Sequence, residues 1–140
     1  MKRILGLDVG DRRIGVAVSD PLHITAQRLT MLERSSSTAD LETIVNLVRE
    51  QDAEAVVIGL PLTLQGAVGN QAQRVMELVE KLQIALPCPV HVLDERLTTV
   101  QGERALLEMN TSRRRRKQLI DQIAAQLILQ TYLDTKRPEI

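Results

Sequence analysis

An aspartate placed inside an apolar strand is the feature that most constrains what this chain can fold into. The N-terminal segment ILGLDVGDRRIGVAVSD predicts two apolar strands, Ile4–Val9 and Ile14–Ser19, joined by a polar turn. Apolar runs of this kind belong in the middle of a sheet, where an ionised carboxylate is costly unless it is paired. Asp8 therefore needs a partner, which is either a neighbouring arginine, Arg12 or Arg13, or a cation held together with other acids.

The rest of the chain alternates between strand and helix patterns. Thr38 is a suitable cap for the first helix, Asn70 caps the second, and Thr98 with Gln101 forms a capping box for the third. The expected strands are 4–9, 14–19, 25–32, 55–60 and 90–93. The expected helices are 39–50, a second that follows Asn70 and ends before Pro87, a third that follows Thr98 and ends at about Glu108, and a last at about 113–135. This order predicts one α/β domain, residues 1–140, with helices on both faces of a mixed five-stranded sheet. A three-strand antiparallel meander and two parallel strands form the sheet, and the first strand is central.

Composition excludes several classes of protein. Lysine and arginine together number 18, as do aspartate and glutamate, so only local clustering of charge can favour nucleic acid. One cysteine and two histidines exclude a disulfide framework and a Cys/His zinc site, so a metal would be held by carboxylates, which favours Mg²⁺ or Mn²⁺. No apolar run approaches the roughly 18–20 residues of a membrane span, and the N-terminus carries no signal-peptide pattern. We therefore expect a cytoplasmic protein that has no membrane partner.

Three positions carry acids where packing alone does not require them. Asp8 lies in the central strand, Asp94 and Glu95 follow a parallel strand, and Asp121 lies at or beside the apolar stripe of the last helix. Each has an ordinary alternative: a salt bridge, a polar strand exit, or a solvated helix face. Their coincidence favours an all-oxygen site for one or two divalent ions, which would activate water against a phosphodiester. Asp20 precedes a proline, and its position favours a role in a turn.

A run of basic residues opens the last helix. Its members, Arg113, Arg114, Arg115, Arg116 and Lys117, lie where cations oppose the helix dipole by roughly 0.3–1 kcal/mol each. Residues that break a local rule of helix stability in this way are expected at functional sites. In this case the basic side chains would bind phosphate one turn before Asp121. The alternative is a solvated helix start that only adds solubility. Arg12 and Arg13, beyond the end of the first strand, are further candidates for contact with phosphate.

Four segments closely resemble the YqgF-type family of pre-16S rRNA nucleases, which are also described as Holliday junction resolvases related to RuvC. The segments are LGLDVGDRRIGVAVSD, VIGLPLTLQGAVG, LDERLTT and SRRRRKQLIDQIAAQLILQTYL. The resemblance implies a ribonuclease H-like fold and a magnesium-dependent nuclease that matures the 5′ end of 16S rRNA. It implies that Asp8, Glu95 and Asp121 are the catalytic acids and metal ligands. It also implies that Arg96 contacts nucleic acid, and that Gly10, Thr98 and Thr99 shape the site.

Other functions remain open from the residues. A junction resolvase would act on DNA, as a symmetric dimer. A non-catalytic module would bind nucleic acid through the basic run and keep the acids for structure. An ATP-binding protein is a third class, since the turn after the first strand resembles the phosphate hairpin of actin-like kinases, but those need a second half of similar size. Tyr132 is the only Phe, Tyr or Trp residue, which favours recognition of the backbone and shape of a nucleic acid, and this serves RNA and DNA alike. A monomer and a homodimer are both compatible with the sequence.

Overall fold

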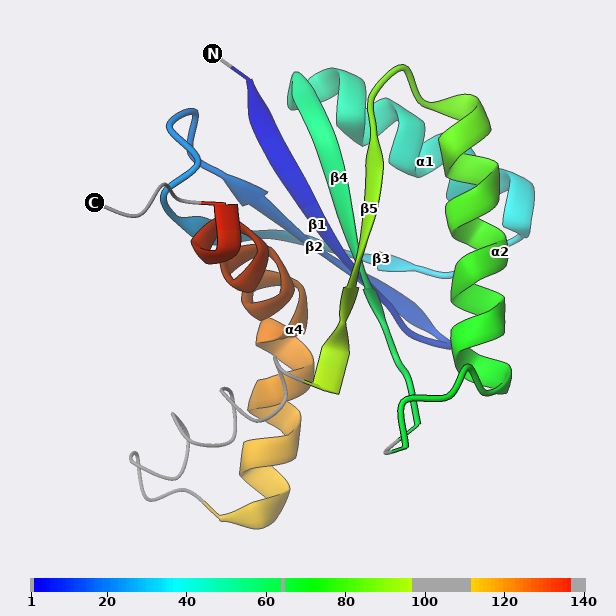
Figure 1. The fold of residues 1–140 in the computed structure, drawn as a ribbon, viewed down its shortest axis with the longest axis vertical. Coiled ribbons are helices and arrows are strands. Elements are labelled where there is room, and N and C mark those ends of the chain that lie inside the picture. The colour runs from blue at the N-terminus through cyan, green and yellow to red at the C-terminus, as the bar shows by residue number, and fades with distance from the viewer. Residues whose placement is uncertain (1, 64, 97–111, 137–140) are drawn as a thin grey trace.

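A five-stranded sheet with the strand order β3-β2-β1-β4-β5 forms the centre of the molecule (Figure 1). The computed structural model describes residues 2–63, 65–96 and 112–136; within the last segment, the side chains of residues 113, 114 and 116–122 are not described. The strands are β1 (Arg3–Val9), β2 (Arg13–Ser19), β3 (Ala26–Glu33), β4 (Ala53–Leu60) and β5 (Val90–Asp94). β2 pairs antiparallel with both β1 and β3, whereas β4 pairs parallel with both β1 and β5. The predicted mixed sheet with a central first strand is therefore confirmed.

Helices cover both faces of the sheet, as the sequence predicts. The helices are α1 (Ser37–Glu50), α2 (Asn70–Ala85) and α4 (Arg113–Lys136). Figure 1 shows α1 and α2 together on one face and α4 on the other. The helix predicted at 98–108 lies outside the described residues. In the described part of the chain, no helix combines the length and the apolar character that crossing a membrane requires.

Two helices begin differently from their predicted caps. Ser36, and not Thr38, caps α1: its backbone is extended and its hydroxyl accepts a hydrogen bond from the Ala39 amide at 3.1 Å. Asp40 still lies in the first turn, and its carboxylate accepts the Ser35 amide at 2.9 Å. Asn70 is the first residue of α2, and the cap position is Gly69, which forms no side-chain capping bond. The cap of α1 is therefore two residues earlier than predicted, and the cap of α2 is one residue earlier.

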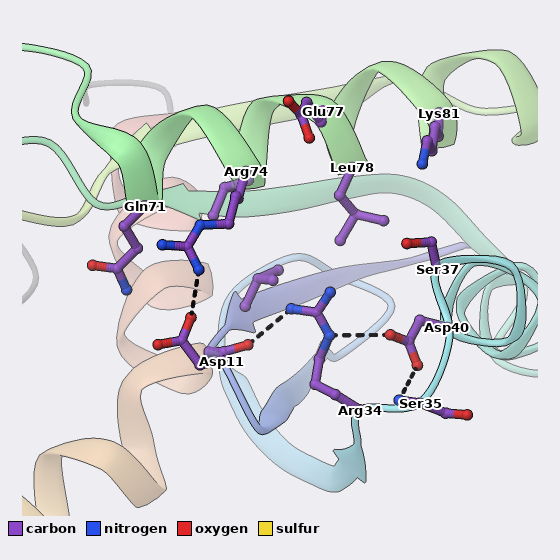
Figure 2. Close-up of a pocket in the computed structure, with 13 residues that line it drawn as sticks. Asp11, Arg34, Ser35, Ser37, Asp40, Gln71, Arg74, Glu77, Leu78 and Lys81 are labelled. Atoms are coloured by element: carbon purple, nitrogen blue, oxygen red, sulfur yellow. Dashed lines mark hydrogen bonds and ion pairs between the residues drawn. The ribbon is translucent and has the colours of Figure 1, made fainter.

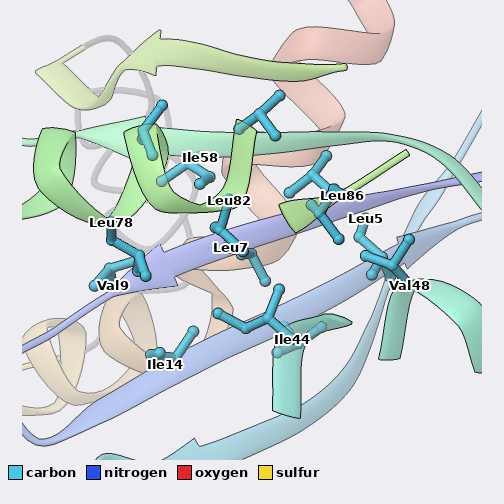
Figure 3. Close-up of a cluster of buried hydrophobic side chains, with 14 of the residues drawn as sticks. Leu5, Leu7, Val9, Ile14, Ile44, Val48, Ile58, Leu78, Leu82 and Leu86 are labelled. Carbon is cyan, nitrogen blue, oxygen red and sulfur yellow. The ribbon is translucent and has the colours of Figure 1, made fainter. Parts of the chain in front are cut away.

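The face beneath α1 and α2 carries the larger hydrophobic core (Figure 3). Alternate residues of β1 point into it because side chains of a strand alternate between its faces. Its fully buried members include Leu5 and Leu7 of β1, Ile44 of α1, Ile58 of β4 and Leu82 of α2. Burying a side chain of this size contributes about 1.5–3 kcal/mol. This layer anchors the central strand that carries Asp8.

The face beneath α4 is built from smaller residues. A β-carbon at Gly6 of β1 would lie 2.7 Å from Cβ of Leu129 and 3.1 Å from the Ala125 carbonyl oxygen, so the missing side chain lets α4 lie directly on the strand. Two glutamines of α4 fix its position against β3: Gln130 accepts the Ala26 amide at 2.9 Å, and Gln126 donates to the Ala26 carbonyl at 3.0 Å. The last helix therefore lies close to the sheet.

Candidate active site

Asp8 lies near the end of β1, on the face that α4 covers. Its cross-strand partner on β2 is Gly15. A β-carbon at Gly15 would lie 3.7 Å from Cβ of Asp8 and 3.5 Å from Cβ of Ala125, so Asp8, β2 and α4 meet at this point. Because Gly15 has no side chain, the half-buried carboxylate keeps open space on its β2 side.

Glu95 reaches Asp8 from the other direction. It follows β5, so its side chain must cross β4 to approach β1. Gly59 of β4 makes the crossing possible: a β-carbon there would lie 2.8 Å from Oε1 of Glu95 and 2.7 Å from its Cγ, too close for any real side chain. The glycine follows Ile58, the partner of Leu7 in the sheet, and it therefore lies on the path between the two acids.

The two carboxyl groups form a hydrogen-bonded pair. Burial, the hydrogen bond to Asp8, and the charges of Asp8 and Asp94 together raise the pKa of Glu95 to about 8. At neutral pH Glu95 is therefore mostly protonated and can donate the hydrogen bond to Asp8. Among the described residues, neither Arg12 nor Arg13 pairs with Asp8; Arg13 contacts Glu33 at 3.2 Å between Nε and Oε1, and both partners are exposed. Among the described side chains, the partner of Asp8 is thus another acid and not an arginine.

Asp94 and Arg96 form a second charged unit beside this pair. The Arg96 guanidinium donates to the Asp94 carboxylate at 2.6 Å from Nη2 and 2.9 Å from Nε, which lowers the pKa of Asp94. Gly66, at φ 82°, lies against the same guanidinium, since a β-carbon there would be 3.2 Å from Nη1. Asp94 therefore orients Arg96 at the mouth of the acidic site, and the loop after β4 lies next to it.

Several predicted site residues fall outside what the structure describes. Thr98 and Thr99 are among them. Asp121 lies on α4, four residues before Ala125, but its side chain is not described, and neither are those of Arg113, Arg114, Arg116 and Lys117. Arg115 is exposed in the first turn of α4. The described side chains bring two acids together, and they contain no group of three or more metal-ligating residues.

The turn after Asp8 is braced on the opposite face of the sheet. A cavity of about 370 Å³ between this turn, α1 and α2 contains the bracing residues (Figure 2). Arg34 donates to the Gly10 carbonyl at 2.9 Å and to Oδ2 of Asp40 at 3.0 Å, and Asp40 is only 6% exposed. Across the cavity, Arg74 lies 3.6 Å from Asp11. Gly10 itself is tight, because a β-carbon there would lie 2.9 Å from the Arg13 carbonyl oxygen.

Sequence reasoning missed the roles of Gly59, Arg34 and Asp40. One signal was available for Asp40: it lies four residues before Ile44 and eight before Val48, so it falls on the buried stripe of α1. An acid in that position needs a buried partner, and Arg34 supplies it. The role of Gly59 depends on which strand separates β1 from β5, and the linear pattern does not show that.

Asp20 and the histidines have structural roles. The Asp20 carboxylate accepts the amides of Leu22, Ile24 and Thr25, at 2.7–3.2 Å, and these bonds, that from Thr25 first, lower its pKa. This is the turn predicted for it. His23 Nε2 lies 2.8 Å from Glu54 and 2.7 Å from the Lys2 carbonyl oxygen, and the ring of His91 stacks on Tyr132.

The fold is that of RuvC, which is ribonuclease H-like. RuvC of T. thermophilus, solved in complex with a Holliday junction substrate, superposes with a TM-score of 0.66, and the match covers 97% of this chain and 96% of RuvC. The sequences are 12% identical, so this likeness shows the fold alone. It confirms the ribonuclease H-like class predicted from the sequence.

The sequence then defines the family. Residues 2–135 match the family described as "RuvX: Holliday junction resolvase", and the chain belongs to that family. It is 53% identical over 132 residues to a protein of Moorella thermoacetica, covering 94% of both chains. It is 49% identical over 133 residues to a protein of Clostridium novyi, covering 95% of this chain and 98% of the other. Both relatives carry the name "Putative pre-16S rRNA nuclease", and the predicted family resemblance is confirmed.

Proposed function

We propose that this protein is a magnesium-dependent nuclease that hydrolyses phosphodiester bonds in structured nucleic acid, and that its substrate is the 5′ end of precursor 16S rRNA. The hydrogen-bonded pair of Asp8 and Glu95 is the observation that carries the proposal. Two acids brought together, one in β1 and one directly after β5, at the cost of a raised pKa for Glu95, are typical of a catalytic site. The names of its relatives support the choice of substrate.

The donor set fits a hard divalent cation. Carboxylate oxygens are the ligands that Mg²⁺ and Mn²⁺ prefer, and a cation would relieve the repulsion that raises the pKa of Glu95. Asp121 completes the proposed set of ligands, since positions 121 and 125 lie on one helix face and Ala125 packs beside Asp8 and Gly15. One or two such ions would activate a water molecule and stabilise the leaving oxygen of the phosphodiester.

The other residues bind and orient the substrate in this proposal. Arg12 and Arg13 are exposed at the turn that follows Asp8, where they can reach phosphate. The hydrogen bonds from Arg96 to Asp94 hold a guanidinium at the mouth of the site. Arg113, Arg114, Arg115, Arg116 and Lys117 would contact the backbone further along α4, while Gly10, Thr98 and Thr99 shape the site. We propose that the protein works in the cytoplasm as one domain, as a monomer or a homodimer.

Cleavage of a four-way DNA junction is the second candidate function. The fold shared with RuvC, which was solved on a Holliday junction substrate, favours it, and so does the description of the family. The two functions need the same acids and differ in the nucleic acid that the surface accepts. A symmetric junction would also require two active sites and hence a dimer.

The test is cleavage of a precursor 16S rRNA fragment and of a synthetic four-way junction, side by side, with and without Mg²⁺. We expect the wild-type protein to cleave the RNA only with Mg²⁺, and Asp8→Asn to lose cleavage at least 100-fold while it still binds the RNA. Preferential cleavage of the junction would transfer the proposal to the second candidate. Cleavage by Asp8→Asn at the wild-type rate would contradict the proposed role of the acids. Salt-dependent binding with no hydrolysis of either substrate would show a non-catalytic module.

A further inference from the structure

A second cavity opens on the same face of the sheet as Asp8 and Glu95. It has a volume of about 280 Å³ and lies between α4 and the edge strand β3, with β2 as its floor. Gly15 of β2, Ala125 of α4, and Arg28 and Met31 of β3 belong to its lining. Arg28 is the one charged side chain among the described residues of that lining.

The floor of this cavity continues directly from the active site. Asp8 pairs with Gly15, and Gly15 pairs with Met31, so the three residues form one row across the sheet. A β-carbon at Gly15 would lie 3.7 Å from Cβ of Asp8 and 3.8 Å from Sδ of Met31. Two strand spacings separate β1 from β3, which is roughly 10 Å. A ligand that extends from Asp8 across the glycine therefore enters the cavity.

Among the described residues, Arg28 has no protein partner, in contrast to three other arginines. Arg13 contacts Glu33, Arg34 contacts Asp40, and Arg96 contacts Asp94. Arg28 is exposed, and it forms neither a hydrogen bond nor an ion pair with any residue in the part of the chain that the structure describes. A guanidinium with all its donors available, beside a cavity, suits an anion and above all the oxygens of a phosphate group.

We propose that this cavity binds the sugar–phosphate backbone of the substrate strand next to the scissile phosphodiester, with Arg28 contacting a neighbouring phosphate. The inference rests on the proposed nuclease function and extends it to a binding site on β3. The volume is slightly below the roughly 300–1,000 Å³ typical of pockets for free small molecules, which favours one unit of a longer chain. Arg28 supplies the charge, whereas Met31 and Ala125 supply an apolar wall for the sugar. DNA and RNA share this chemistry.

The test compares Arg28→Gln with Arg49→Gln, which removes the same charge from an exposed position on α1, on the other face of the sheet. Fluorescence anisotropy in EDTA measures binding, without cleavage, of a labelled precursor 16S rRNA fragment and of a labelled four-way DNA junction. We expect Arg28→Gln to weaken binding about tenfold. The decrease of the logarithm of the binding constant with the logarithm of the salt concentration should become shallower by about 0.7–0.9, because one phosphate contact is lost. Arg49→Gln should match the wild-type protein. The substrate that loses more affinity is the one whose backbone occupies the cavity.

A second variant tests the cavity itself. Met31 is 39% exposed, so Met31→Glu places a carboxylate beside the cavity on an exposed strand edge, where it costs the fold little. We expect it to weaken binding at least as much as Arg28→Gln, because like charges repel the phosphate. In Mg²⁺, both variants should raise KM and leave kcat unchanged, since the contact is present in the ground state and the transition state alike. Circular dichroism would verify that both variants are folded.

The outcomes separate this inference from the proposed function. If the wild-type protein cleaves nucleic acid and both variants bind as it does, the cavity is not a substrate site and the nuclease function stands. If the wild-type protein never cleaves but its binding depends on Arg28 and Met31, the nuclease proposal fails and the binding site stands. Equal effects of Arg28→Gln and Arg49→Gln would also overturn the inference, as would a wild-type protein that binds neither substrate.

Discussion

The two faces of the sheet are built on opposite principles. Beneath α1 and α2, the sheet presents large aliphatic side chains such as Leu5 and Leu7, which pack into a continuous core (Figure 3). Beneath α4, the strands present mostly smaller residues, with Ile4 and Val57 the larger ones, and Asp8 of β1 meets Glu95, which follows β5. The larger hydrophobic cluster lies on one face, while the other has a smaller cluster and also brings two carboxyl groups together. Changes to the acids should therefore affect activity, whereas changes to the packed residues of either face should affect stability.

The largest loss of stability should come from the core face. Leu82→Ala removes a fully buried side chain of α2 and should lower the free energy of unfolding by about 2–5 kcal/mol, because a cavity remains. Urea denaturation measures the loss. Ile84→Ala on the same helix, where the side chain is 87% exposed, should change the stability by less than about 0.5 kcal/mol. Similar losses for the two variants would contradict the placement of the core.

The contact between β1 and α4 should tolerate no added methyl group. Gly6→Ala would collide with Cβ of Leu129 and the Ala125 carbonyl oxygen, and should cost about 1–3 kcal/mol as α4 is pushed away. Gly15→Ala is the matched control, since its β-carbon meets only ordinary contacts of 3.5–3.8 Å, and it should be neutral or slightly stabilising. Thermal unfolding of both variants checks this. A larger loss for Gly15→Ala would contradict the packing of α4.

The contacts of Arg34 with Asp40 and with the Gly10 carbonyl should affect both stability and activity. Arg34→Ala removes the partner of the buried Asp40 and the bond to the Gly10 carbonyl, and should cost about 1–3 kcal/mol. It should also reduce kcat, because Gly10 belongs to the turn that follows Asp8. Urea denaturation and single-turnover cleavage measure the two effects. Arg74→Ala, which breaks an exposed contact with Asp11, should change the stability by less than about 1 kcal/mol.

The acidic pair should make stability depend on pH. The pKa of Glu95 is raised from 4.5 to about 8, so the stability that its protonated form contributes is complete below about pH 4.5 and is lost as the pH rises through 8. In EDTA we expect the free energy of unfolding to fall by about 1–2 kcal/mol over this range, since water screens a half-buried charge. Glu95→Gln should remove this loss. An equal loss in wild type and Glu95→Gln would contradict the assignment.

The sequence predicted the framework of both faces. The apolar run around Asp8 was enough to predict that the acid lies in a central strand and needs a partner, and the structure places it on the face opposite Leu5 and Leu7. Turn chemistry correctly assigned Asp20. The caps of α1 and α2 were wrong, because several residues near each start can cap a helix and tertiary contacts select one. In α1, the bonds of Asp40 favour a start after Ser36.

The interactions between distant elements needed the structure. The sequence singled out Asp8 and Glu95, but their direct contact depends on Gly59 of the strand between them. It singled out Arg12 and Arg13 for phosphate, whereas Arg28, in a strand with weak alternation, stood out only when its lack of a partner and its cavity were known. These features follow from the order of strands in the sheet and from pairing across it, which no local pattern of residues records.

The free energy of unfolding of Asp8→Asn, measured in EDTA at pH 8 beside its cleavage activity, tests most directly whether the α4 face is built for chemistry. Replacing one member of a like-charged pair removes repulsion, so we predict a variant that is as stable as the wild-type protein, or up to about 1 kcal/mol more stable, and inactive. A loss of more than about 2 kcal/mol would contradict the account, since it would show that the fold itself needs Asp8.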